Sequence, residues 1–241
     1  MPFNVSYRLL TEVISPIFML THANQTVYYE EMRNSASPDT RASAPAGPRG
    51  TTRVRSKLRR EEILAAAAAL FARRGFHGVS IDDIGSAAGM SGPGIYRHFP
   101  GKEAVLSRML LDISQQLLDE GSRRAVAAAD AQGALDALLR WHISFALSQP
   151  DLITVQSREL ANVPEPARRQ IRRLQRLYVE EWVTVLSELS PRAAQVSLRA
   201  AVHATFGLLN STPHSASELP PEAAAELLYT MARAALAAAA A

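Results

Sequence analysis

The sequence predicts an all-α protein in which a small N-terminal helical domain precedes a larger helical domain. From Arg53 onward, apolar residues recur at the three- and four-residue spacing of amphipathic helices. No stretch shows the strict apolar–polar alternation of a half-buried strand. Prolines and glycines interrupt the pattern at intervals, which predicts where helices end. The chain has 241 residues, of which 47% are hydrophobic, so it can bury a sizeable core.

Residues 1–52 differ in composition from the rest of the chain. Residues 33–53 are rich in Ser, Pro, Ala, Gly and Arg, which is typical of a disordered segment. We expect 1–52 to be a disordered extension, or its first 31 residues to precede a true translation start at Met32. A secretory signal in 9–20 is not favoured, because Glu12 and Pro16 interrupt the apolar run.

Composition also limits the chemistry that the chain can perform. It contains no cysteine, which excludes a disulfide scaffold, a thiolate zinc site and a cysteine nucleophile. No apolar run is long enough to cross a membrane, so no membrane partner is expected. The sequence has no nucleophile elbow, no pair of metal ligands at helical spacing and no phosphate loop. We therefore expect a cytoplasmic, nucleoid-associated protein that is not an enzyme and has no cofactor or metal.

Three helices are predicted between residues 53 and 106. One face of the first collects Leu58, Ile63, Leu64, Ala67, Leu70 and Phe71. Gly75 is predicted to end this helix at its C′ position. Ser80 is predicted to cap the second helix, with Ile81, Ile84 and Ala88 facing inward and Gly89 ending it. The second and third helices are separated by a tight turn, which indicates a helix-turn-helix.

The stretch SGPGIYRHFPGKEAV, residues 91–105, places weak helix formers at the start of the third helix. Gly92 and Gly94 leave room for the backbone to approach DNA, and Pro93 fits a first helical turn. Ile95 and Phe99 share an inward face. Gly101 is predicted to cap the next helix.

The polar and basic residues around this stretch are the candidate DNA contacts. Among residues 91–99, Arg97 alone is of a type suited to bidentate base recognition, so we expect it to supply most direct base reading. Ser80 is either a plain cap or a cap that also contacts phosphate, and Arg55 and Lys57 either contact DNA or begin a solvated helix. The full set is Arg55, Lys57, Ser80, Ser91, Gly92, Pro93, Gly94, Tyr96, Arg97, His98 and Lys102.

Residues 63–106 resemble the DNA-binding domain of the TetR family of transcriptional regulators. The matching residues are Gly75, Phe76, Ser80, Ile81, Ile84, Gly89, Tyr96, His98, Phe99, Lys102 and Glu103. Gly85 departs from the family's usual alanine, and residues 92–94 stand where many members carry base-reading donors. The resemblance implies that 53–106 is a helix-turn-helix domain and that 107–241 binds a ligand and forms a homodimer.

The C-terminal part is predicted to contain helices at about 102–120, 131–148, 151–161, 165–189, 191–211 and 220–240. The last two match the positions of the family's dimerising helices. The predicted interface comprises Leu198, Val202, Thr205, Leu208, Leu227, Leu228 and Met231. The alternative is that these side chains fill the core of a single protomer.

The predicted effector pocket combines apolar and aromatic side chains with a few polar groups. Its candidates are Trp141, His142, Phe145, Arg172, Arg176, Tyr178, Trp182, Phe206 and Asn210. Core packing is the alternative for the aromatic residues. The arginines either form a solvated helix face or bind an anionic group such as the phosphates of an acyl-CoA.

These observations favour a ligand-responsive DNA-binding transcriptional regulator. We expect a repressor that a small hydrophobic or acyl-CoA-like effector releases from a palindromic, double-stranded DNA operator. The alternative is a DNA-binding activator or architectural regulator without ligand control.

Overall fold

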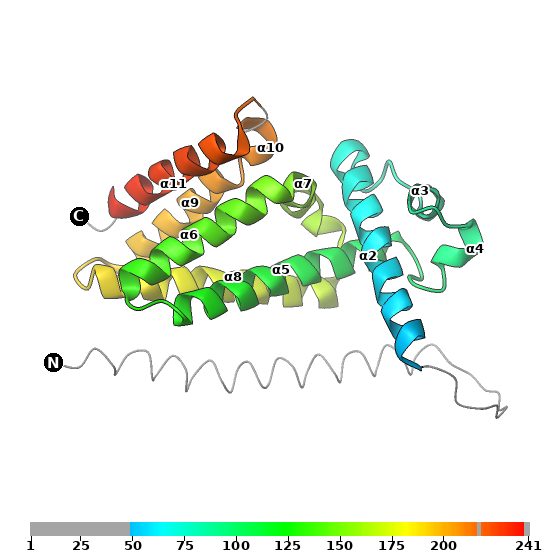
Figure 1. Ribbon diagram of the computed structural model, residues 1–241, viewed down its shortest axis with the longest axis horizontal. Helices are drawn as coiled ribbons and strands as arrows, with labels where there is room; N and C mark the ends of the chain where they lie inside the picture. The colour runs from blue at the N-terminus through cyan, green and yellow to red at the C-terminus, as the bar shows by residue number, and fades with distance from the viewer. Residues whose placement is uncertain (1–48, 216–217, 239–241) are drawn as a thin grey trace. The chain divides into compact units, whose positions relative to one another are not determined.

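The structure is a computed structural model that describes residues 49–215 and 218–238. The prediction for residues 1–52 therefore lies almost entirely outside the described residues. The described residues from Thr51 onward belong to one compact unit. Every regular element in the described ranges is helical, which confirms the predicted all-α class (Figure 1).

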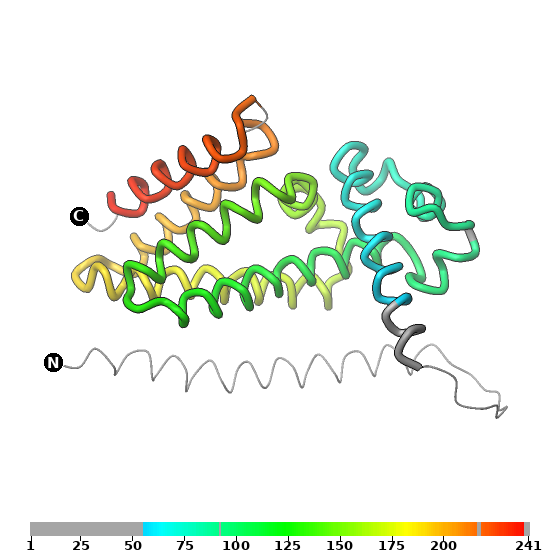
Figure 2. The backbone as a smooth tube through the Cα atoms, viewed as in Figure 1, coloured from blue at the N-terminus to red at the C-terminus, as the bar shows by residue number. Residues whose placement is uncertain are grey.

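The helices follow one another along the chain as Figure 1 and Figure 2 show. They are α2 (Arg49–Arg74), α3 (Ile81–Ala87), α4 (Gly92–Ile95), α5 (Lys102–Val126), α6 (Ala131–Ser148), α7 (Pro150–Glu159), the 3₁₀ helix η1 (Leu160–Asn162), α8 (Glu165–Leu189), α9 (Gln195–Leu209), α10 (Thr212–Ser215) and α11 (Pro221–Ala238).

The helix ends in the N-terminal domain follow local sequence rules. Gly75 ends α2 with φ +70°, and its N–H donates to the Phe71 carbonyl at 2.9 Å. Gly89 follows α3 with φ +65°. Both glycines adopt the left-handed backbone that other residues rarely tolerate. The predicted ends of these two helices are thereby confirmed.

The predicted third helix is shorter than the sequence suggested. Regular α-helix covers only Gly92–Ile95, and the chain continues as a turn in which the His98 N–H donates to the Ile95 carbonyl at 2.9 Å. Two glycines and a proline give this segment little intrinsic helicity. The inward face is nevertheless confirmed, because Ile95 and Phe99 are buried.

Residues 55–62 in the first part of α2 are all exposed. Leu58 was predicted to face inward, but 54% of its surface is exposed. The prediction was wrong because helical periodicity identifies a face but not the point where a partner begins to cover it. Burial starts at Ile63, so residues 55–62 form an exposed helical arm.

The C-terminal domain is built on α5, which packs along α6 and α8. The predicted end of α5 near residue 120 was too early, since the helix continues to Val126. Helix α9 begins at Gln195 rather than near 191, because residues 190–193 form a turn in which the Ala193 N–H donates to Ser190 at 3.0 Å. The short α10 was not predicted. Its Thr212 hydroxyl donates to the Ala146 carbonyl at 3.0 Å, which ties α10 to α6.

The predicted interface residues divide into two groups. Leu198, Val202, Thr205 and Leu228 are buried in the protomer core, so they present no surface to a second chain. Their inclusion was wrong, because apolar helical spacing does not distinguish the face that packs inward from the one left outside. Leu227 and Met231 are 49% and 46% exposed, and Leu208 is partly exposed.

Helices α5 and α8 approach each other closely at Gly121. A Cβ at this position would lie 2.7 Å from Cε2 of Tyr178, which is far inside van der Waals contact. The buried Tyr178 ring therefore packs directly on the α5 backbone. Gly85 in α3 is different, because a Cβ there would lie 3.6 Å from the Ile95 Cβ, an ordinary contact distance.

We predict opposite effects for alanine at these two glycines. Gly121→Ala is expected to lower the free energy of unfolding by about 1–3 kcal/mol, because the new methyl group displaces the Tyr178 ring. Gly85→Ala is expected to raise it by about 0.5–1 kcal/mol, because alanine favours the helix and fits the space. Urea unfolding followed by circular dichroism measures both. Equal changes in the two variants would contradict the assigned packing.

Candidate functional site

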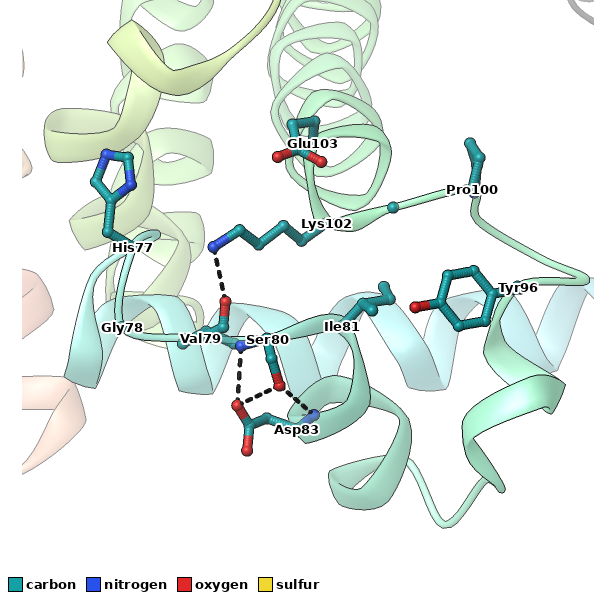
Figure 3. A pocket seen from close by; sticks show the side chains of 11 residues that line it. His77, Gly78, Val79, Ser80, Ile81, Asp83, Tyr96, Pro100, Lys102 and Glu103 are labelled. Carbon is teal, nitrogen blue, oxygen red and sulfur yellow. Dashed lines mark hydrogen bonds between the residues drawn. The ribbon is translucent and has the colours of Figure 1, made fainter.

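An open groove of about 600 Å³ lies where α3 and α5 begin (Figure 3). Its lining includes Ser80, Asp83, Tyr96, Gly101, Lys102 and Glu103. The groove thus brings together three of the predicted DNA contacts: Ser80 before α3, Tyr96 after α4 and Lys102 at the start of α5.

Ser80 forms the predicted N-cap as part of a reciprocal capping box. The Asp83 N–H donates to Ser80 Oγ at 3.0 Å, and the Ser80 N–H donates to Asp83 Oδ2 at 2.8 Å. The Ser80 hydroxyl also donates to Asp83 Oδ2 at 2.6 Å, as the dashed lines in Figure 3 show. These hydrogen bonds lower the pKa of Asp83. The hydroxyl proton is thus already used within the cap, and a phosphate contact by Ser80 would have to break that bond.

Lys102 has its ammonium group turned back into the domain. Its Nζ donates to the Phe76 carbonyl at 3.0 Å and to the Val79 carbonyl at 2.9 Å. The same nitrogen lies 4.4 Å from the centre of the Phe76 ring. These contacts hold the start of α5 against the loop between α2 and α3. A phosphate contact by Lys102 remains a prediction, and it would compete with these bonds.

The segment after α4 presents its polar side chains outward. Tyr96 is 51% exposed and Arg97 is exposed, while His98 is half-buried. Arg97 has no ion-pair partner within residues 49–215 and 218–238. A guanidinium that is free of internal partners is available to an external acceptor.

The exposed arm of α2 lies near this segment. Burial lowers the pKa of His98, and the nearby charges of Arg60, Arg59 and Arg97 lower it further. Arginines from α2 and from the segment after α4 thus share one cationic region. The sequence favoured Arg55 and Lys57 over Arg59 and Arg60 as DNA contacts of the basic arm, whereas the structure places the charges of Arg59 and Arg60 near His98.

Arg55 and Lys57, the predicted contacts in the arm, are both exposed. The Lys57 ammonium lies 3.9 Å from the Glu61 carboxylate, with both side chains largely exposed. Such a pair is weak and leaves the lysine accessible. Ser91 and Pro93 are exposed beside α4, where the Gly94 N–H donates to the Ser91 carbonyl at 2.8 Å.

A second constellation lies in the C-terminal domain, where four rings from three helices meet. His142 from α6, Tyr178 from α8 and Phe206 from α9 are nearly parallel, with interplanar angles of 9–17°. Their ring centres are 4.7–5.8 Å apart. Trp182 stands perpendicular to all three, at 87–90°. We call these four residues the aromatic cluster.

A buried hydrogen-bond chain runs through the aromatic cluster. His142 Nε2 lies 3.1 Å from Asn210 Oδ1, and His142 Nδ1 lies 3.3 Å from the Tyr178 hydroxyl. Because Asn210 Oδ1 only accepts, Nε2 carries the proton and Nδ1 accepts from Tyr178. Burial lowers the pKa of His142 to about 4, so the ring is neutral at pH 7. Burial raises the pKa of the Tyr178 phenol.

The remaining predicted pocket residues lie elsewhere. Trp141 contacts Phe145 at 6.5 Å between ring centres and carries the Arg124 guanidinium at 5.1 Å, so these rings form a separate group. Arg172 and Arg176 are exposed. Because successive helix residues turn by about 100°, Arg176 points roughly opposite to Tyr178 on α8. Grouping these arginines with the aromatic residues was wrong, because the sequence prediction did not take the rotation between successive helix residues into account.

No three metal-ligating side chains gather within the described ranges. Among the helices that the structure describes, none is both long and apolar enough to cross a membrane. What the structure does present is a capped helix, a tight turn and an exposed cationic segment, which together define a helix-turn-helix protein of the DNA-binding class.

Comparison with known proteins identifies the family. The family described as bacterial regulatory proteins, tetR family, matches residues 63–109. The tetracyclin repressor-like C-terminal domain matches residues 128–235. The chain therefore belongs to the TetR family of transcriptional regulators.

Individual relatives match over only part of the chain. The transcriptional repressor KstR2 from Rhodococcus jostii is 33% identical over 81 residues, which covers 34% of this chain and 40% of that protein. The match thus spans less than half of the relative's length.

Solved structures match over a larger part of the chain. A TetR-family regulator from Bordetella parapertussis is 27% identical with a TM-score of 0.65, covering 72% of this chain and 93% of the other. AibR, solved in complex with isovaleryl coenzyme A and operator DNA, is 21% identical with a TM-score of 0.61. The match covers 72% of this chain and 97% of the AibR chain. At 21% identity, this similarity supports only the shared fold.

We predict that Lys102, which lines the groove, also stabilises the fold. Lys102→Met is expected to lower the free energy of unfolding by about 1–3 kcal/mol, because two carbonyls lose a charged donor. Arg97→Ala is the control, and its stability is expected to change by less than about 0.5 kcal/mol, since Arg97 is exposed. Thermal and urea unfolding measure both. An unchanged stability of Lys102→Met would show that these bonds contribute little.

We also predict a pH dependence that arises from His142. Its pKa is lowered to about 4 in the folded protein, against 6.5 for the unfolded reference. The unfolded chain therefore takes up the proton first, and stability is lost as the pH falls from about 6.5 towards 4. The loss approaches about 3 kcal/mol.

Urea unfolding between pH 7 and pH 4.5 tests this dependence. His142→Gln keeps hydrogen-bonding groups but cannot titrate, so its stability is expected to fall less steeply over this range. The difference between the two slopes isolates His142 from carboxylates that titrate in the same range. Parallel slopes for the two proteins would contradict the prediction.

Proposed function

We propose that this chain is a ligand-responsive repressor that binds a palindromic operator as a homodimer. The observation that carries the proposal is the exposed cationic region formed by Arg97 and the arm of α2. Phosphate contacts supply much of the affinity of such proteins, and base contacts supply specificity. The repressor role is supported by the similarity to KstR2, a transcriptional repressor.

Arg97 is the proposed base-reading residue. It is exposed, lacks an ion-pair partner in the described ranges, and follows a helix whose glycines let the backbone approach a groove closely. Arg55, Lys57, Arg59 and Arg60 are proposed to contact phosphates. The remaining specificity would come from DNA shape and the spacing of the half-sites.

Exposed apolar strips on α9 and α11 support dimerisation. Val196, Ala200 and Gly207 are exposed on α9, and Leu227, Met231 and Ala234 are exposed on α11. The two helices pack against each other within the protomer. A second copy related by a two-fold axis would bury both strips and place two recognition segments on paired half-sites. The sequence prediction missed the α9 strip because it selected the opposite face of the helix, which carries Leu198 and Val202.

The effector is proposed to bind the C-terminal domain. The aromatic cluster is buried and contains a few polar groups, as small-molecule sites do. AibR was solved with a coenzyme A thioester, so an acyl-CoA-like effector is one class to test beside small uncharged hydrophobic compounds. Release from DNA requires that the effector bind one dimer geometry more tightly than the other.

A mobility-shift experiment tests the function. The full-length chain is mixed at low salt with DNA from immediately upstream of its own gene, and the complex is challenged with acyl-CoA thioesters and with uncharged hydrophobic compounds. Binding followed by release with one compound is the result expected of a ligand-responsive repressor. Binding that no compound releases would argue against ligand control. An absence of binding to any genomic fragment would overturn the proposal.

We predict that Arg97→Ala relaxes base preference. In a selection from random DNA, discrimination at the base pair that Arg97 contacts is expected to fall by about 1–3 kcal/mol, because a bidentate contact is lost. Arg60→Ala is the matched control. It is expected to weaken binding to all sequences alike and to reduce the salt dependence. Unchanged selected sequences for Arg97→Ala would rule out the proposed role.

A further inference from the structure

We propose that the aromatic cluster binds a flat, uncharged ring that carries a hydrogen-bond acceptor, and that Phe206 fills the place of that ring in this structure. The inference rests on the proposed function, since it names the chemical class of the effector. It also goes beyond that function, because binding at this site is measurable without DNA.

The geometry of the cluster singles out Phe206. His142, Tyr178 and Trp182 are buried, whereas Phe206 is partly exposed. Its ring stacks on His142 at 4.7 Å and on Tyr178 at 5.5 Å, and it meets the Trp182 ring at right angles at 5.1 Å. The other three rings thus form a box, and Phe206 is the member closest to the outside. A flat ring that replaced Phe206 would meet the same three aromatic surfaces.

The box also contains a donor that the folded chain leaves unused. The indole N–H of Trp182 is buried and has no hydrogen-bond partner in the part of the chain that the structure describes. It lies near enough to the Tyr178 hydroxyl to lower the pKa of the phenol, against the larger opposite effect of burial, but it does not reach hydrogen-bond geometry. A buried donor without a partner is costly, so an acceptor brought by a ligand would be favoured there.

The surrounding charges favour an uncharged ligand. His142 is neutral, and the buried Glu181 carboxyl is close enough to raise the pKa of Tyr178. An anion in the box would meet this carboxyl and would find no cation among the four rings. The nearest arginines along α8, Arg172, Arg173 and Arg176, are exposed, and Arg176 points roughly opposite to Tyr178.

The test uses three small probes of similar size. Acetophenone has a flat ring and a carbonyl acceptor, isopropylbenzene has the ring without the acceptor, and benzoate has the ring with a negative charge. Dissociation constants are measured by isothermal titration calorimetry on the full-length chain without DNA. Phe206→Ala is expected to bind acetophenone at least about tenfold more tightly than the original protein, because the ring no longer competes with Phe206.

Trp182→Phe in the Phe206→Ala background tests the donor. This change is expected to weaken acetophenone about tenfold, as loss of one buried hydrogen bond predicts, and to change isopropylbenzene by less than about twofold. Benzoate is expected to bind more weakly than acetophenone in both. Phe145→Ala is the control for a cavity made elsewhere in the same domain. Its probe binding is expected not to respond to Trp182→Phe.

Several results would overturn the proposal. They are equal binding of acetophenone to Phe206→Ala and the original protein, an equal effect of Trp182→Phe on both neutral probes, and benzoate binding as tight as that of acetophenone. Circular dichroism shows whether Phe206→Ala folds. If it does not, Phe206→Leu removes the stacking while keeping more volume, and the same comparisons decide.

The mobility-shift experiment separates this proposal from the proposed function. The expected probe pattern without any DNA binding would support the site and refute the repressor. DNA binding with a failed probe pattern would support a DNA-binding regulator and refute this site.

Discussion

The contact of the Lys102 ammonium with the carbonyls of Phe76 and Val79 fixes the geometry on which the other features depend. Lys102 is the first residue of α5, and the two carbonyls belong to the loop between α2 and α3. One charged side chain thus joins the helix-turn-helix to the helix that forms the centre of the C-terminal domain. The Lys102 ammonium also lies over the Phe76 ring, which adds a cation–π contact to the two hydrogen bonds.

At the other end of α5, packing rather than charge sets the geometry. Gly121 lets the Tyr178 ring rest on the α5 backbone, and Tyr178 in turn belongs to the stack with His142 and Phe206. The position of the aromatic cluster is therefore linked to the position of α5 by direct contact. Phe206 belongs to α9, which also carries one of the exposed apolar strips, so the cluster contacts the candidate dimer helix as well.

The sequence predicted features that depend on neighbours along the chain. The Ser80 cap and the Gly75 terminus follow from local hydrogen bonding and backbone preference. Leu58 was misplaced because its burial depends on where a partner begins to cover α2, which helical spacing alone does not give. Leu198 and Val202 have the same apolar spacing as a true interface, and only the packing of α8 and α11 shows that they face inward.

The aromatic cluster also shows that contacts between distant helices cannot be predicted from neighbours along the chain. Tyr178 and Trp182 are four residues apart, so their shared face was visible in the sequence. Their meeting with His142 and Phe206 depends on the packing of three helices, which no local rule supplies. The unused Trp182 donor was also beyond sequence reasoning, because satisfaction of a buried group depends on every neighbour. The sequence alone could have excluded Arg176 from the face of Tyr178, since two residues turn a helix by about 200°.

Helix α5 runs from the helix-turn-helix into the C-terminal domain, so a small change in its direction at one end displaces its other end. With a rise of about 1.5 Å per residue, Gly121 lies roughly 29 Å along the helix axis from Lys102. A tilt of a few degrees at the Tyr178 contact would move the Lys102 end by roughly 1–2 Å over that length. Displacements of this size decide whether hydrogen bonds to a base edge or a phosphate form, because their donor–acceptor distances span only a few tenths of an ångström. A small rearrangement of rings in one domain would thereby be amplified into a displacement at the start of α5, next to the proposed DNA contacts.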